Sequence, residues 1–351
     1  MNKYILVIAL IFCGAYLSFL SGEEKAPKTG GPFEIELKEP ASKYWMYVPN
    51  EYTQYRSWPL MILLHGAGGN AKDLIPLFTD EAQSNGYIVA ALKSPGQTWT
   101  DMDEKLIFKA IEDIRKKYSI DSGRIFLAGF SAGSFMTCLI GFKNHSMFRG
   151  IAPIAGAIAG KLQGQEFVKD KDIKEASKHL AVLIVCGDQD PGYAMSQQAY
   201  KTLQKEKVDV EFHIMPGVGH TFDQTAVSWI YEKFQDRLNK PDELLKRGKK
   251  ASSDKRYLDA IDAFNKIVET CKDNKKEEKS VKEAQQELKK IGKISSDKYS
   301  QALKMIDAKK IDEGIKLLNE IITQFEGTSV WEKAMSKLNE IELPGNRLQE
   351  K

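Results

Sequence analysis

The stretch Arg124-Ile-Phe-Leu-Ala-Gly-Phe-Ser131-Ala-Gly133 joins a β-branched and aromatic run to the pattern Gly-x-Ser-x-Gly, and helix-like residues 134–143 follow it. A strand that turns sharply into a helix holds one residue in a strained backbone conformation, and flanking glycines leave room for the chains to pass. Such a turn exposes the serine hydroxyl at a sheet edge. The pattern is short and also occurs in ordinary turns, so its strand-and-helix context favours a nucleophile elbow at Ser131.

Strand-like runs alternate with helical runs on both sides of this stretch. Residues 60–64 and 179–185 are apolar on both faces, as buried parallel strands are, and residues 104–118 carry aliphatic side chains at helical spacing. This alternation predicts an α/β fold with a doubly wound, mostly parallel sheet, whose first two strands are antiparallel. The expected strands are 33–37, 44–48, 60–64, 88–92, 125–128, 150–154, 181–185 and 210–215.

The composition changes at Pro241, where β-branched runs end and Lys and Glu become dense. We therefore predict a catalytic domain over residues 33–240 and a smaller all-α domain over 241–351. Residues 257–268 align with 311–322, so this domain contains an internal repeat. The paired helices resemble tetratricopeptide-like repeats, which would give them a protein partner. The unit is longer than usual and lacks the usual signature, so a plain helical bundle is the alternative.

The first residues read as a targeting segment. A lysine precedes residues 4–20, which carry no charge, and small or polar residues follow. We predict a signal peptide or an N-terminal anchor over residues 1–22 and a linker over 23–32. The protein is then exported, and is secreted, periplasmic or held at the outer face of the membrane by residues 4–20.

Charge and cysteine content narrow the function classes. The chain of 351 residues has 51 basic and 48 acidic residues, so no single-sign field points to a nucleic acid. Beyond the leader lie Cys138, Cys186 and Cys271, which we expect to be buried. Their spacing fits neither a disulfide framework nor a metal site, so we expect no metal and no organic cofactor.

A serine nucleophile needs a base and an acid. Of the five histidines, His220 alone lies in a glycine-rich loop after a late strand, where a mobile base belongs. Asp188 and Asp190 both follow the preceding strand, and we favour Asp190 because it extends further toward the site. The chain order Ser131, Asp190, His220 is the one expected for an α/β-hydrolase.

Two backbone N–H groups must face the developing oxyanion. Ala132 follows the nucleophile directly, and Ala67 lies in the glycine-rich loop His65-Gly-Ala-Gly-Gly69, so we predict these two donors. The same loop could be read as a phosphate cradle, but no Gly-Lys-Ser/Thr follows it.

Residues 60–223 resemble the α/β-hydrolase superfamily, and within it the secreted feruloyl esterases and polyhydroxybutyrate depolymerase-like esterases. The resemblance rests on residues 65–69, 118–133, 148–156, 187–191 and 217–220. Two departures concern the substrate: Gly133-Ser134 replaces the usual glycine pair, and the disulfides common in secreted relatives are missing. Trp99 and Tyr193 are expected at the carboxyl edge of the sheet, so we name them as substrate-contact candidates, with a packing role as an equal alternative for each.

These features predict a carboxylic ester hydrolase that acts through an acyl-enzyme on a small-molecule or polysaccharide-linked ester. Two alternatives stay open. One is a peptidase or thioesterase on the same fold, and the other is an inactive hydrolase domain that carries a helical binding scaffold.

Overall fold

The computed structural model describes residues 27–38, 42–162 and 164–342. Eight described strands form one sheet with the order β1-β2-β4-β3-β5-β6-β9-β10. The first two strands pair antiparallel with their neighbours and the other strands run parallel, which confirms the predicted fold class. The strands are β1 (Gly30–Leu37), β2 (Ser42–Val48), β3 (Trp58–Leu64), β4 (Ile88–Leu92), β5 (Ile120–Phe130), β6 (Gly150–Ile154), β9 (Ala181–Gly187) and β10 (Asp209–Met215). A small hairpin comprises β7 (Lys161–Leu162) and β8 (Gln165–Glu166).

All eight predicted strands are present, and β5 differs most from its expected range. It begins at Ile120 rather than at residue 125, because Trp58 pairs with Ile120 across an irregularity in the β3–β5 register. The added residues are polar and are held locally, since Asp121 accepts hydrogen bonds from the Gly123 N–H and from Arg124. Hydrophobic periodicity does not detect a strand of this kind.

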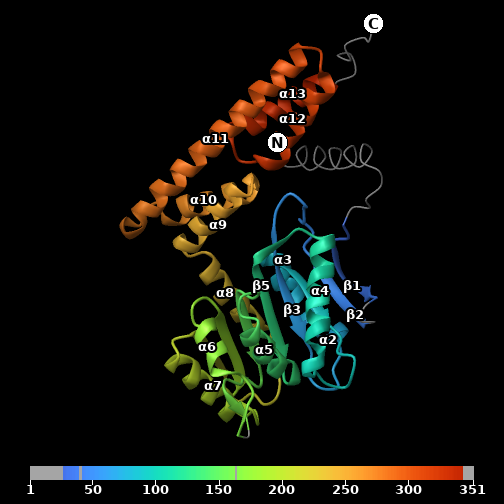
Figure 1. Ribbon diagram of the computed structural model, residues 1–351, viewed down its shortest axis with the longest axis vertical. Coiled ribbons are helices and arrows are strands. Elements are labelled where there is room, and N and C mark those ends of the chain that lie inside the picture. Colours follow the sequence, from blue (N-terminus) through green and yellow to red (C-terminus); the bar gives the residue numbers. More distant parts are fainter. Residues whose placement is uncertain (1–26, 39–41, 163, 343–351) are drawn as a thin grey trace.

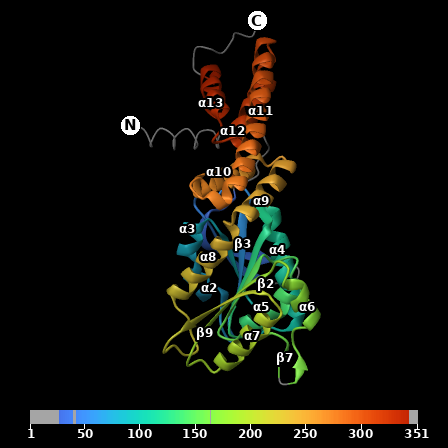
Figure 2. The same ribbon diagram turned by 90° about the vertical axis from the view of Figure 1, so that its left-hand side faces the viewer.

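Helices cover both faces of the sheet (Figures 1 and 2). One face packs against α4 (Glu104–Lys117), α5 (Ala132–Lys143), α6 (Asp170–Ala176) and α7 (Tyr193–Lys205). The other face packs against α2 (Ala71–Leu74), α3 (Pro76–Asn85) and α8 (Gln224–Leu238). The predicted spacing in α4 buries one stripe, and a capping box between Thr100 and Asp103 precedes the helix in the short turn η1 (Asp101–Asp103).

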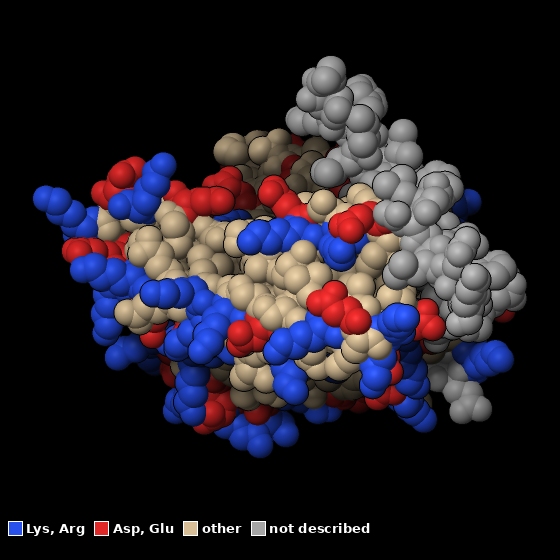
Figure 3. Space-filling view, turned by 90° about the horizontal axis from the view of Figure 1, so that it is seen from above, with Lys and Arg blue, Asp and Glu red and all other residues tan. Residues whose placement is uncertain are grey.

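The residues after α8 form helices around a separate core. They are α9 (Pro241–Ser253), α10 (Tyr257–Cys271), η2 (Lys275–Glu277), α11 (Glu278–Asp307), α12 (Ile311–Gln324) and α13 (Ser329–Glu342). The aligned residues Phe264 and Leu318 are both fully buried, as are Ile267 and Ile321. Seen from this end of the molecule, acidic and basic side chains alternate around an uncharged central area (Figure 3). The tetratricopeptide-like assignment stays a prediction.

The helical region lies at the amino ends of the parallel strands, beyond β3 and β5 in Figure 1. The carboxyl ends of these strands point away from it, toward the opposite end of the molecule. The short link Asn239–Lys240 joins α8 to α9 at the predicted domain boundary. The helices are therefore separated from the edge where loops follow the strands.

The remaining structural findings concern the cysteines, the predicted leader and the membrane-spanning character of the helices. Cys138, Cys186 and Cys271 are buried free thiols. The predicted leader, residues 1–22, lies outside the described residues. Among the helices that are described, none has the length and apolar character needed to span a bilayer.

Candidate active site

The turn between β5 and α5 has the geometry of a nucleophile elbow. Ser131 adopts φ 55° and ψ −115°, a conformation that L residues rarely occupy. A methyl group on Gly129 would lie 2.2 Å from the Gly133 carbonyl oxygen, and one on Gly133 would lie 2.2 Å from the Leu64 oxygen. Both positions therefore require glycine. The Ser131 N–H donates to the Ile154 oxygen of the neighbouring strand at 2.9 Å, which fixes the strained residue against the sheet.

The three predicted triad residues form one hydrogen-bonded chain. The Oγ of Ser131 lies 2.8 Å from Nε2 of His220, and Nδ1 of His220 lies 2.8 Å from Oδ2 of Asp190. The Asp190 side chain is fully buried, whereas the His220 side chain is 47% exposed. A buried carboxylate can orient the imidazole and stabilise its protonated form, while the exposed ring stays accessible to a substrate.

The loops that carry Asp190 and His220 are held together by backbone contacts. Gly187 approaches Val218 so closely that a Cβ would lie 2.0 Å from the Val218 oxygen. This oxygen also accepts the Gln189 N–H at 3.0 Å. Glycine at position 187 thus allows the two strand-end loops to meet beside the elbow.

Asp188 and Asp190 have different positions in this arrangement. Oδ1 of Asp188 accepts the Gly217 N–H at 2.8 Å, so this carboxylate joins the two loops. Oδ1 of Asp190 accepts the Gly192 N–H at 2.6 Å, which leaves Oδ2 for His220. The geometry therefore favours Asp190 as the partner of the histidine, in agreement with the preferred reading of the sequence.

The His220 ring is also positioned by packing. Its centroid lies 5.1 Å from the centroid of Phe130, which directly precedes the elbow serine at the end of β5, and Phe130 in turn contacts Phe222. Aromatic contacts of this kind restrict the orientation of the imidazole. Neither phenylalanine was singled out from the sequence, although each lies within two residues of a predicted site residue.

The glycine-rich loop after β3 lies against the elbow. A Cβ on Gly66 would lie 3.3 Å from the Cβ of Ser131. In the described structure, the N–H groups of Ala67 and Ala132 donate to no other residue, and Ala67 is exposed. These donors are therefore free to bind an anionic oxygen, as the oxyanion prediction requires; their role remains a prediction.

The side chain of His65 fixes the glycine-rich loop through hydrogen bonds. Its Nδ1 donates to the Gly66 oxygen at 2.7 Å, and its Nε2 accepts the Ser94 N–H at 3.1 Å. Burial, together with the charge of nearby Lys93, lowers the pKa of His65 and favours the neutral ring that this bonding requires. The sequence offered one signal for such a role, because His65 directly follows a buried strand.

The two predicted substrate contacts have different environments. Trp99 is only 7% exposed and its indole N–H donates to the His65 oxygen at 2.8 Å, so it supports the glycine-rich loop from within the core. Of the two alternatives left open for Trp99, this placement favours packing over substrate contact. Tyr193 is partly buried at the start of α7, and its hydroxyl accepts a hydrogen bond from Gln197 at 3.0 Å. A substrate role for Tyr193 stays a prediction.

Ser134, which departs from the usual glycine, lies behind the elbow. Its hydroxyl and that of Thr137 are buried without a hydrogen-bond partner. Neither side chain faces solvent, so neither offers a direct contact for a substrate.

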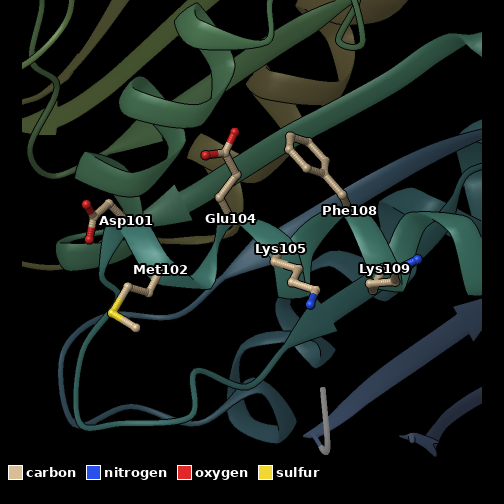
Figure 4. A pocket seen from close by; sticks show the side chains of 6 residues that line it. All are labelled: Asp101, Met102, Glu104, Lys105, Phe108 and Lys109. Carbon is tan, nitrogen blue, oxygen red and sulfur yellow. The ribbon is translucent and has the colours of Figure 1, made fainter. Parts of the chain in front are cut away.

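A surface hollow of about 370 Å³ lies at the start of α4 (Figure 4). Its lining residues are Asp101, Met102, Glu104, Lys105, Phe108 and Lys109. None of them was predicted as a site residue. Among the described residues, no group of three or more His, Cys, Asp or Glu side chains could hold a metal ion.

Comparisons with known proteins support the fold. Residues 97–237 match the phospholipase/carboxylesterase family. The chain is 36% identical to poly(3-hydroxyalkanoate) depolymerase C of Paucimonas lemoignei over 63 residues, which are 18% of this chain and 15% of that protein. It is 26% identical to the probable feruloyl esterase C of Aspergillus terreus over 155 residues, 41% of this chain and 56% of that protein. The chain thus spans less than two thirds of each relative.

Among solved structures, the chain is similar to an S954A mutant of the feruloyl esterase module from Clostridium thermocellum complexed with sinapinate. The two share 17% identity with a TM-score of 0.48, and the match covers 60% of this chain and 94% of that one. The sheet order, the elbow and the family match agree with one another. The chain therefore has an α/β-hydrolase fold that resembles the feruloyl esterases and polyhydroxyalkanoate depolymerases, followed by a helical C-terminal region.

Proposed function

We propose that this chain is a carboxylic ester hydrolase that works through an acyl-enzyme intermediate. The observation that carries the proposal is the hydrogen-bonded chain from Ser131 through His220 to Asp190, with both distances at 2.8 Å. The strained elbow supports it, because φ 55° combined with ψ −115° lies outside the left-handed region that turn residues adopt, and such strain is typical of functional sites.

Each residue has a defined role in this mechanism. His220 Nε2 takes the Ser131 proton as Oγ attacks the ester carbonyl, and Asp190 stabilises the imidazolium that forms. The N–H groups of Ala132 and Ala67 bind the oxyanion. The imidazolium then protonates the leaving alcohol. Water, deprotonated by His220, attacks the acyl-enzyme and releases the acid.

The substrate class follows from the relatives and from the exposure of the site. The names of the similar proteins indicate ester substrates, which supports a small-molecule or polysaccharide-linked ester here. A histidine that is 47% exposed is compatible with an ester attached to a large carrier. A peptidase or thioesterase would use the same triad, and a panel of matched ester, amide and thioester substrates distinguishes these activities.

The cellular setting and the domain roles are part of the proposal. Residues 1–22 would direct export or anchor the chain outside the membrane, and residues 23–32 would link them to a catalytic domain over 33–240. Residues 241–351 would then form a tetratricopeptide-like domain that holds a protein partner. The Lys/Glu-rich helices and their repeated apolar positions support this division.

The first test is hydrolysis of a short-chain nitrophenyl ester by the full chain. We expect Ser131→Ala to lower kcat by at least about 10⁴-fold, because the nucleophile is lost. Ser146→Ala changes the same side chain at an exposed position and should retain the rate of the parent protein. Circular dichroism checks that both variants are folded. Equal turnover by the Ser131→Ala variant would contradict the proposed mechanism.

A further inference from the structure

The two outer strands of the sheet, β1 and β10, differ in how they could pair with another chain. Among the described strands, each has a neighbour on one side only, so its other side presents unpaired N–H and C=O groups. In β1 this row is interrupted, because Pro32 lacks an N–H and the register with β2 shifts between Gly30 and Phe33. Glu34 and Glu36 are exposed there and add like charges. Such interruptions oppose the addition of a further strand.

The strand β10 has no comparable interruption. It contains neither proline nor glycine, and it pairs with β9 from Asp209 to Met215 without a register shift. Its two carboxylates are neutralised within the chain, since Arg237 binds Asp209 at 2.6 Å and Glu211 at 2.8 Å. Ile214 is 40% exposed and is one of three large apolar side chains that face solvent among the described residues. Of the two outer strands, β10 is therefore the one suited to further pairing.

The backbone hydrogen bonds show which groups of β10 point outward. The Asp188 N–H, just beyond β9, donates to the Met215 oxygen at 3.1 Å, so the polar backbone groups of Met215 face β9. The direction of these groups alternates from one residue of a strand to the next. Val210, Phe212 and Ile214 therefore direct their N–H and C=O groups away from β9. Each of them offers one donor and one acceptor on the open side of the strand.

A second copy of β10 presents a matching row when it lies antiparallel. Two identical strands related by a twofold axis bring one residue opposite itself. With Phe212 on the axis, Val210 lies opposite Ile214 of the second copy, so all the outward-facing residues pair with one another. Each such pair exchanges two hydrogen bonds. An axis at Glu211 or His213 would leave one outward-facing residue beyond the end of the other strand.

The same register is complementary in its side chains. Glu211 lies opposite His213 of the second copy, on the face of the sheet that α8 covers. The His213 ring stacks on Trp229 with the centroids 5.0 Å apart, and within the described part of the chain it forms no hydrogen bond. An imidazole N–H can donate to a carboxylate, and side chains at such opposite positions are close neighbours. On the face that α7 covers, Phe212 and the apolar residues beside it meet their counterparts.

We propose that two copies of this chain associate through β10 as an antiparallel, twofold-symmetric pair that joins their sheets into one. The occupant is a second copy rather than an unrelated strand, because the contact of Glu211 with His213 then forms twice. The helical region lies at the amino ends of the parallel strands (Figure 1). Antiparallel pairing therefore places the catalytic edge of each copy on the same side as the helical region of the other.

Sedimentation velocity of the full chain tests the proposal. Protein concentrations up to about 100 μM cover the range in which a complex of micromolar Kd is populated. We expect a species with twice the mass of one chain, in a concentration-dependent equilibrium with the monomer. Circular dichroism checks that each variant is folded.

Ile214→Lys and Leu77→Lys form a matched pair of variants. Ile214→Lys should raise the Kd of the pair by at least about tenfold, because it removes an apolar cross-strand contact at two symmetry-related places and adds like charges. Leu77, on α3, is 42% exposed and lies outside β10 and the two helices that flank it. Leu77→Lys should therefore leave Kd unchanged.

Hydrogen–deuterium exchange tests the register, and it does so even if Ile214→Lys does not fold. Mass spectrometry with electron-transfer fragmentation resolves the exchange of single N–H groups. Those of Val210, Phe212 and Ile214 should exchange more slowly at a concentration where the parent chain is paired than at one where it is monomeric, because pairing removes them from water.

Three results would overturn the proposal. One is a parent chain that stays monomeric over the whole concentration range. Another is an association that Ile214→Lys and Leu77→Lys affect equally, because the copies would then meet away from β10. The third is a paired chain in which the outward-facing N–H groups of β10 exchange as fast as in the monomer.

Discussion

The two edges of the sheet are built in opposite ways. At the carboxyl edge, Ser131 has a strained backbone, His220 is half-exposed, and free N–H groups lie beside them. At the amino edge, Arg56 and Arg256 bind carboxylates of α10, and helices cover the ends of the strands. The first edge leaves polar groups available for a substrate. At the second edge the polar groups form ion pairs that attach α10 to the end of the sheet. Changes to the catalytic side chains of the first edge should therefore affect mainly turnover, and changes to the ion pairs of the second should affect mainly stability.

The largest effect is expected at the carboxyl edge, from Asp190→Asn. The amide cannot stabilise the imidazolium, so kcat for the nitrophenyl ester should fall by about 10⁴-fold. Asp188→Asn is the matched control, because its side-chain oxygen can still accept the Gly217 N–H and kcat should change by less than about tenfold. Steady-state kinetics measure both. If the two losses were reversed, Asp188 would be the triad acid.

A smaller effect is expected from two glycine-to-alanine changes that compare the elbow with an exposed helix. In Gly133→Ala the new methyl group would overlap the Leu64 carbonyl, so the free energy of unfolding should fall by about 3 kcal/mol. In Gly292→Ala, within α11, no atom beyond the adjoining backbone of the helix lies within 4 Å of the new methyl group, and helix propensity should raise stability by up to about 1 kcal/mol. Urea denaturation measures both changes. A tolerated Gly133→Ala would show that the elbow is not tightly packed.

The smallest effect is expected from Arg56→Ala at the amino edge. This change removes the ion pairs with Asp262 and Glu326, which are partly exposed, so the loss of stability should be about 1 kcal/mol and should shrink at high salt. The kcat of the folded protein should stay that of the parent, because the ion pairs lie at the opposite edge from Ser131. A substantial loss of kcat would show that the two edges are coupled.

More of the carboxyl edge than of the amino edge could be predicted from the sequence. The eight strands were predicted because apolar runs and turn signals are local properties of the chain. Chain order admitted both Asp188 and Asp190 as the triad acid, and Asp190 was preferred because it lies further beyond the strand end. The sequence left packing and substrate contact equally open for Trp99, because an aromatic residue in a loop gives the same pattern in both cases.

The attachment at the amino edge could not be predicted from periodicity. Asp259, Asp262 and Lys266 are spaced by three and four residues, so they share one face of α10. A charged face of this kind normally faces solvent, and only the tertiary structure shows that Arg56 and Arg256 meet it. The helical pattern therefore does not show whether this face of α10 meets solvent or protein, and the ion pairs between distant parts of the chain do.

The most direct test of the catalytic centre is labelling of the full chain with a fluorophosphonate probe, which reacts with activated serines, followed by mass spectrometry of the peptides. We expect the phosphonyl group on Ser131, with labelling abolished in Ser131→Ala and greatly slowed in His220→Ala. An unlabelled folded protein, or a label on a different serine, would contradict the assignment of Ser131 as the nucleophile.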